Sequence, residues 1–173
     1  ETARYARLDH RDGPSLILCD VSGSMSTTAG SRTRYQHLVE ALTQVYQPDM
    51  GIIAFSSIAV PITHPSDLPK PSGGTAIHLA LAEARKARPS ATLVISDGEP
   101  DNGTADLAIS IADQMTGRID VIYVGPDGNA AAIAFLHRLA RAGAGSCVMH
   151  RWDVPGHPAL VHTMRQLLRG PTS

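Results

Sequence analysis

Three oxygen-bearing side chains stand at alternate positions where an apolar run ends. Residues 16–19 read Leu-Ile-Leu-Cys, and Asp20, Ser22 and Ser24 follow them. A carboxylate and two hydroxyls are suitable ligands for a hard divalent cation such as Mg²⁺, which prefers oxygen donors. The same side chains can also cap a turn, because Asp and Ser accept hydrogen bonds from nearby backbone N–H groups. Spacing alone therefore leaves both a metal site and an ordinary turn open.

Two further polar residues extend this set. Thr75 comes after a glycine pair, and Asp97 comes after the apolar run 91–96. Taken singly, Thr75 could cap a helix and Asp97 could lie in a simple turn. Added to the first three side chains, they give two carboxylates and three hydroxyls without a histidine or cysteine. Such a set favours a hard cation over zinc.

A site of this kind would leave its cation able to bind another molecule. Magnesium keeps several waters, so hydroxyl groups can touch the ion while carboxylates reach it through water. An ion whose direct protein ligands are mostly neutral stays electrophilic, and an Asp or Glu of a partner protein can complete its coordination. Mg²⁺ is the first choice for this cation, with Mn²⁺ and Ca²⁺ as alternatives.

Apolar runs alternate with segments of helical period along the chain. Strands are predicted over 15–19, 50–55, 91–96, 119–124 and 146–150. Helices are predicted over 34–46, 76–87, 104–115, 130–142 and 159–168. This alternation indicates an α/β fold: a doubly wound, mostly parallel central sheet with helices on both faces. Ligands of such sheets bind where the carboxyl ends of the strands meet, which is where the polar set would lie.

One segment departs from the alternation. Residues 58–63 follow the second strand too closely for a crossover helix, so they predict one antiparallel edge strand, where Pro61 is tolerated. The length of 173 residues predicts a single domain over 1–173, with its core over about 15–170. The chain begins at Glu1, which is compatible with its being part of a longer protein.

The polar motifs resemble those of von Willebrand factor type A (vWA) domains. Residues 20–25, Asp-Val-Ser-Gly-Ser-Met, match the family's Asp-x-Ser-x-Ser motif, residues 73–75 are similar to its threonine loop, and residues 96–100 to its aspartate loop. The resemblance covers nearly the whole chain from about residue 15 and implies a Rossmann-like vWA fold with a metal-ion-dependent adhesion site (MIDAS). It implies Ser22, Ser24 and Thr75 as hydroxyl ligands and Asp20 and Asp97 as mainly water-mediated carboxylate ligands.

Members of this family generally bind partners and do no chemistry at the metal. The chain lacks a terminal cysteine pair, and its sequence Ser-Asp-Gly-Glu-Pro is similar to that of bacterial intracellular members of the family. Those members work beside AAA+ ATPases or in multiprotein assemblies. The resemblance thus implies a cytoplasmic, non-enzymatic module that binds an acidic residue of a protein partner through the cation. His78, Glu99 and Asp101 are candidates for contact with that partner, and Asp106 adds acidity nearby.

Composition argues against other partner classes. Hydrophobic residues make up 43% and charged residues 18%, with a formal net charge of -1, which is typical of a globular protein and gives no reason to expect nucleic-acid binding. No stretch approaches the roughly 18 apolar residues of a membrane span, so no membrane is expected as a partner. Cys19 and Cys147 both lie in predicted strands, and no disulfide is expected between them. The oligomeric state is left open.

Two other functions are compatible with the sequence. Magnesium-dependent phosphohydrolases of the haloacid dehalogenase type also place a carboxylate after the first strand of a parallel sheet. Their chemistry needs a second carboxylate two residues on, where this chain has Ser22, and the nucleotide-binding and hydrolase glycine motifs are also missing there. The other alternative is a structural domain with an empty metal site, which would show stability and partner binding that do not depend on a cation.

Overall fold

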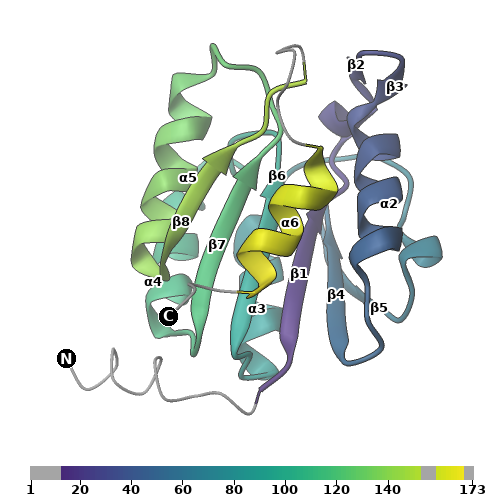
Figure 1. The fold of residues 1–173 in the computed structure, drawn as a ribbon. Helices are drawn as coiled ribbons and strands as arrows, with labels where there is room; N and C mark the ends of the chain where they lie inside the picture. Colours follow the sequence, from purple (N-terminus) through teal and green to yellow (C-terminus); the bar gives the residue numbers. More distant parts are fainter. Residues whose placement is uncertain (1–12, 153–158, 170–173) are drawn as a thin grey trace.

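A mixed six-stranded sheet forms the centre of the molecule (Figure 1). The computed structural model describes residues 13–152 and 159–169. Within them the sheet has the order β5-β4-β1-β6-β7-β8, and every neighbouring pair is parallel except β4 and β5. The strands are β1 (Ser15–Asp20), β4 (Met50–Phe55), β5 (Ala59–Ile62), β6 (Ala91–Ser96), β7 (Arg118–Tyr123) and β8 (Ala144–Met149). The predicted parallel sheet with one antiparallel edge strand is confirmed.

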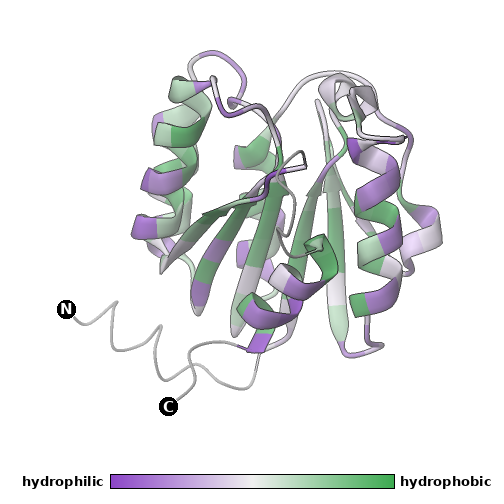
Figure 2. Cartoon of the chain, turned by 45° about the horizontal axis from the view of Figure 1, so that its top comes forward, coloured by the Kyte–Doolittle hydropathy of each residue, from purple (hydrophilic) through white to green (hydrophobic). Residues whose placement is uncertain are grey.

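Helices cover both faces of the sheet, as predicted. On one face lie α2 (Arg34–Val45) and α6 (Leu160–Arg169), and on the other lie α3 (Ile77–Lys86), α4 (Ala105–Gln114) and α5 (Ala130–Ala142) (Figure 1). Figure 2 shows apolar strands between helices that carry their hydrophilic residues outward. Among the described residues, no helix is both long and apolar enough to cross a membrane.

The core is divided into two layers by the sheet. Leu18 and Phe55 pack against α3, α4 and α5, whereas their neighbours Ile17 and Ala54 pack against α2 and α6. This follows from the alternation of side chains along a strand, and it requires strands that are apolar on both faces. Trp152 packs in the same cluster as residues of α6, and its ring stacks on His37 of α2 at a centroid distance of 4.4 Å.

A short ribbon before α2 was not predicted from the sequence. β2 (Thr28–Ala29) and β3 (Arg32–Thr33) pair in antiparallel orientation across Gly30, whose φ of 73° suits a glycine, and Ser31. Thr33 then caps α2: its Oγ1 accepts from Gln36 N, and the Gln36 side chain accepts from Thr33 N. The ribbon and the cap together fix the direction in which α2 leaves the first loop.

The sheet changes winding direction between β1 and β6. From β1 the chain passes through α2 on one face to β4, whereas from β6 it passes into α4 on the opposite face. Loops that diverge in this way leave a crevice at the carboxyl ends of the two strands, where ligands of open α/β sheets bind. Cys19 of β1 is paired with Ile95 of β6, so the residues that follow each of them meet at this crevice.

Gly125 allows the end of β7 to pass close to the loop after β6. A Cβ at Gly125 would overlap with the carbonyl oxygen of Asp97 and lie 2.6 Å from Tyr123 Oη. Gly125→Ala is therefore expected to lower the free energy of unfolding by about 1–3 kcal/mol, because overpacking against a backbone carbonyl is not relieved by a side-chain rotation. Chemical denaturation measures this change.

Gly98→Ala is the matched control. A Cβ at Gly98 would have no atom of the described residues within 4 Å, so the free energy of unfolding should change by less than about 0.5 kcal/mol. Equal stabilities of Gly125→Ala and Gly98→Ala would contradict the prediction.

Candidate metal centre

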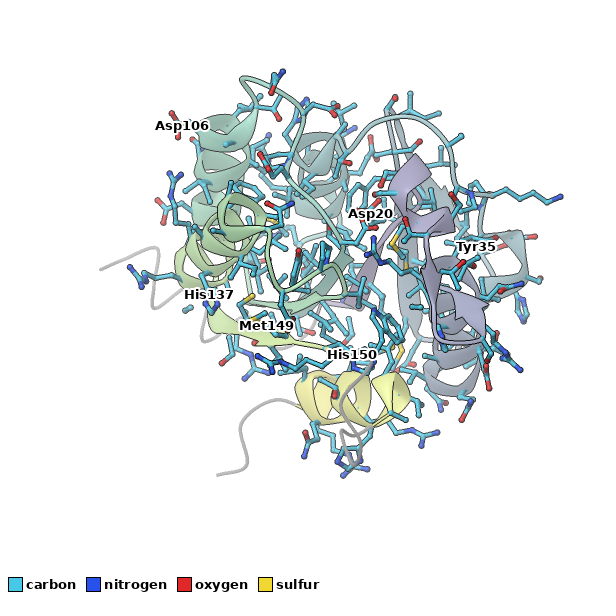
Figure 3. All side chains as sticks on the ribbon, turned by 90° about the horizontal axis from the view of Figure 1, so that it is seen from above. Asp20, Tyr35, Asp106, His137, Met149 and His150 are labelled. Carbon is cyan, nitrogen blue, oxygen red and sulfur yellow. The ribbon has the colours of Figure 1, made fainter. Side chains whose placement is uncertain are left out.

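Asp20, the last residue of β1, lies at the centre of the crevice. Its Oδ1 accepts a hydrogen bond from Ser22 N at 2.7 Å, and its Oδ2 accepts one from Ser96 Oγ at 2.7 Å. The side chain is fully buried. Figure 3, which looks down on the carboxyl ends of the strands, shows Asp20 toward the middle of the molecule. The orientation of this carboxylate is thus fixed by groups from the turn after β1 and from the end of β6.

A 3₁₀ turn over Gly23–Ser26 places the two predicted serine ligands side by side. Ser22 Oγ and Ser24 Oγ lie 3.1 Å apart, and Ser24 Oγ donates to Asp97 Oδ1 at 2.7 Å. Ser22 is buried, Ser24 is exposed, and the side chain of Met25 anchors the turn in the core. The turn therefore holds one hydroxyl inside the crevice and one at its mouth.

The threonine loop is tied to both of the other loops. Gly23 N donates to Gly73 O at 3.1 Å, which joins it to the serine turn. On the other side Thr75 N donates to Asp101 Oδ1 at 2.8 Å, and Asp101 N donates to Thr75 O at 3.0 Å. Gly73 has a φ of 76°, a conformation that favours glycine. Three segments far apart in the sequence are thus joined at one edge of the sheet.

The structure therefore gathers the predicted ligand set, to different degrees. The side chains of Ser22, Ser24 and Asp97 are joined by hydrogen bonds between their oxygens. The Asp20 carboxylate is linked to them through the backbone N–H groups of Ser22 and Asp97. Thr75 is buried beside them and is attached through its backbone. Metal ligation by these five residues stays a prediction.

The three predicted partner-contact residues differ in their surroundings. The carboxylate of Asp101 is engaged with Thr75 N and so supports the threonine loop. Glu99 is exposed, and His78, in the first turn of α3, is half-buried with no hydrogen-bond partner for Nδ1 among the described residues. Asp106 lies away from the centre: its side chain is exposed on α4, pairs with Arg138 at 3.3 Å and lies at the rim of the molecule in Figure 3.

Sequence reasoning missed one residue of the centre, Arg34. Its Nη1 donates to Asp97 Oδ2 at 2.9 Å, and the two side chains are 12% and 0% exposed. The same nitrogen lies 3.4 Å from the carbonyl oxygen of Ser24. One sequence signal was available: an arginine in the first turn of a helix is disfavoured by the helix dipole unless an acid lies near it.

Two buried carboxylates share the crevice, and this affects the protonation of Asp20. The pKa of Asp20 is raised to about 6, mainly by burial and then by the negative charge of Asp97, while hydrogen bonds from Ser22 and Ser96 lower it in part. A divalent cation would relieve this repulsion. The described residues contain no group of three or more His, Cys, Asp or Glu side chains suited to a metal, so ligation here requires the hydroxyls. Such an all-oxygen set fits Mg²⁺.

The raised pKa of Asp20 predicts a pH dependence of stability without a cation. Between pH 4 and 6 the folded protein retains the Asp20 proton that the unfolded chain has lost, so stability falls as pH rises through this window. In EDTA the contribution is about 3 kcal/mol, from about 1.4 kcal/mol per pKa unit. The measurement is the difference in unfolding free energy between wild type and Asp20→Asn at each pH. A difference that does not change between pH 4 and 6 would contradict the prediction.

Comparison with known proteins identifies the fold. No protein-family model and no curated protein matches the chain. Three solved structures align with a TM-score of 0.64. The conserved hypothetical protein BatB from Bacteroides thetaiotaomicron is 19% identical over 91% of this chain and 100% of that chain. An aerotolerance-related membrane protein from Bacteroides fragilis NCTC 9343, with multiple mutations to serines, is 19% identical over 91% and 98%.

The third structure is the VWA domain of SpRpn10, which is 16% identical over 93% of this chain and 99% of that chain. At these identities the alignments establish the arrangement of the chain in space. The chain has the fold of a von Willebrand factor type A domain.

Proposed function

We propose that the protein is a cation-dependent protein-interaction module that binds an Asp or Glu of a partner at the centre formed by Asp20, Ser22, Ser24, Thr75 and Asp97. The observation that carries the proposal is the convergence of two buried carboxylates and three hydroxyl residues at the switch point of the sheet. The vWA fold, which commonly serves protein interaction, supports the same function. Mg²⁺ is the proposed cation, with Mn²⁺ and Ca²⁺ as alternatives.

Each residue has a role that its surroundings support. Ser22, Ser24 and Thr75 would supply neutral oxygens, while Asp20 and Asp97 would supply charge from the wall of the crevice. When bound, the cation provides an electrophilic centre for an incoming carboxylate. Ser24, the exposed member, marks the side from which a partner has access. A cytoplasmic setting, and an assembly of several proteins or with an AAA+ ATPase, belong to this proposal as its biological context.

One feature makes an enzyme the weaker proposal. Phosphohydrolase chemistry needs a second acid two residues after the first carboxylate, and Ser22 stands there with its hydroxyl 3.1 Å from that of Ser24. A structural domain with an empty centre is a stronger rival, because Arg34 already supplies a positive charge to Asp97. Cation-dependent stability separates this rival from the proposed function.

Thermal unfolding with and without Mg²⁺ or Mn²⁺ is the direct test of the centre. A cation at about 100 times its dissociation constant is expected to stabilise the folded protein by about 2.7 kcal/mol. Ser22→Ala and Thr75→Ala, which remove predicted hydroxyl ligands without changing charge, should reduce this stabilisation. Ser26→Ala is the matched control, because Ser26 lies on the same turn but its exposed hydroxyl donates to Gly23 O. Equal unfolding midpoints of the wild type with cation and with EDTA would refute the proposed cation site.

Peptide selection tests the carboxylate ligand. Selection from a random-peptide library in Mg²⁺ is expected to yield peptides whose binding depends on one acidic residue, because the open position of the cation takes an anionic oxygen. Changing that residue from Glu to Gln, or adding EDTA, should each reduce binding at least about tenfold, which corresponds to the loss of about 1.4 kcal/mol. Peptides that bind equally well in EDTA would argue for a different docking surface.

A further inference from the structure

Arg34 places a positive charge at the candidate metal centre, and none of the ligand motifs contains it. We propose that its guanidinium is a built-in counter-ion of Asp97 that competes with the divalent cation. Arg34 would thereby weaken cation binding and leave the bound cation more receptive to a partner's carboxylate. This inference rests on the proposed function, since it concerns the same centre. In it, Arg34 sets how strongly the centre binds the divalent cation and how strongly the bound cation attracts a partner's carboxylate.

The guanidinium lies against two of the predicted ligands. Nη1 is 2.9 Å from Asp97 Oδ2 and 3.4 Å from the carbonyl oxygen of Ser24. Because the Asp97 side chain is fully buried and that of Arg34 is 12% exposed, water and salt screen this pair only slightly. Asp97 therefore has both oxygens engaged, Oδ1 by Ser24 Oγ and Oδ2 by Arg34. A cation that uses Asp97 must share or displace the guanidinium.

The helix start makes this arginine dependent on Asp97. Arg34 is the first residue of α2, at the positive end of the helix dipole, and the first turn carries no acidic residue. The backbone at this point is fixed by the Thr33 cap and by a hydrogen bond from Arg34 N to Thr27 O at 3.0 Å. The main chain is thus held in place, and a change in the position of the guanidinium would come from the side chain.

The side chain has room to turn away from Asp97. Arg34 lines a pocket of about 350 Å³ between the β2–β3 ribbon and the ends of β7 and β8, and Asp127 lines the same pocket. Within the described part of the chain, Arg34 Nε has no hydrogen-bond partner. Asp127 is half-exposed and lies 3.8 Å from Arg151, so its carboxylate is accessible to a second cationic group. The pocket thus leaves the guanidinium space to move away from Asp97.

Charge explains why such competition would favour an acidic partner. Asp20 and Asp97 carry two negative charges, of which Arg34 compensates one. A divalent cation that binds with Arg34 still nearby leaves an excess of positive charge, whereas without Arg34 the charges cancel. Arg34 therefore disfavours the cation by repulsion and favours the anionic side chain of a partner by attraction.

Titration of the full chain with Mn²⁺ by calorimetry tests this role. Arg34→Gln is expected to bind Mn²⁺ about tenfold more tightly than wild type, since the repulsive charge is gone. Arg34→Lys keeps the charge and should bind as weakly as wild type. Arg32→Gln is the matched control: it removes an exposed charge two residues away that pairs with Glu40, and it should leave the affinity unchanged. In EDTA, Arg34→Gln should melt below wild type because Asp97 loses its partner.

A second measurement uses the unaltered protein, so it does not depend on the folding of the variants. In ¹⁵N-labelled wild type, the Nε–H signal of Arg34 should shift on saturation with Mg²⁺, as the guanidinium changes its contact with Asp97. Equal or weaker Mn²⁺ binding by Arg34→Gln, or an unchanged Arg34 signal in the saturated protein, would overturn the inference. Binding by Arg34→Gln but not by wild type would support the inference and overturn the proposed function. Absence of binding in both proteins would overturn both.

Discussion

The burial of two carboxylates in one crevice is the constraint on which the centre depends. As whole residues, Asp20 and Asp97 are only 0% and 3% exposed, and two such charges at close range are unfavourable without compensation. The compensation comes from the backbone N–H of Ser22, the hydroxyls of Ser24 and Ser96, and the guanidinium of Arg34. These groups come from the turn after β1, from the end of β6 and from the start of α2, so these three segments must be held together before the carboxylates are tolerated.

The sheet supplies this arrangement through its winding. Because α2 and α4 leave β1 and β6 toward opposite faces, the ends of these two strands are not covered by either connection. The carboxylates occupy the uncovered point, and the backbone bonds of Gly23 with Gly73 and of Thr75 with Asp101 close the ring of loops around it. Hydroxyls complete the centre without adding negative charge. A third carboxylate in their place would add to the repulsion from Asp97, which together with the larger effect of burial already raises the pKa of Asp20 to about 6.

The sequence was sufficient to predict the features of the fold that depend on local residue patterns. Strands and helices lie within about two residues of their predicted bounds, since buried strands need continuous apolar runs and helices need a periodic apolar face. The polar residues after β1 and β6 were expected at one edge because the carboxyl ends of parallel strands meet there. The pairing of Arg34 with Asp97, 63 residues away, was not predictable, because it depends on the angle at which α2 leaves the β2–β3 ribbon. Each strand of that ribbon has only two residues, too few to produce an alternating pattern.

Asp101 shows that the role of an acidic residue depends on its tertiary contacts. In the sequence it stands among acids that could meet a partner, but in the fold its carboxylate and its N–H form a reciprocal pair with the backbone of Thr75. Two hydrogen bonds, one of them to a charged group, join the threonine loop to the aspartate loop, and such bonds are worth more than neutral ones. A displacement of Thr75 must therefore break both bonds or carry the 97–101 loop with it. Because Asp97 opens that loop and holds Arg34, movement at the threonine loop would also reach the ion pair at the centre of the crevice.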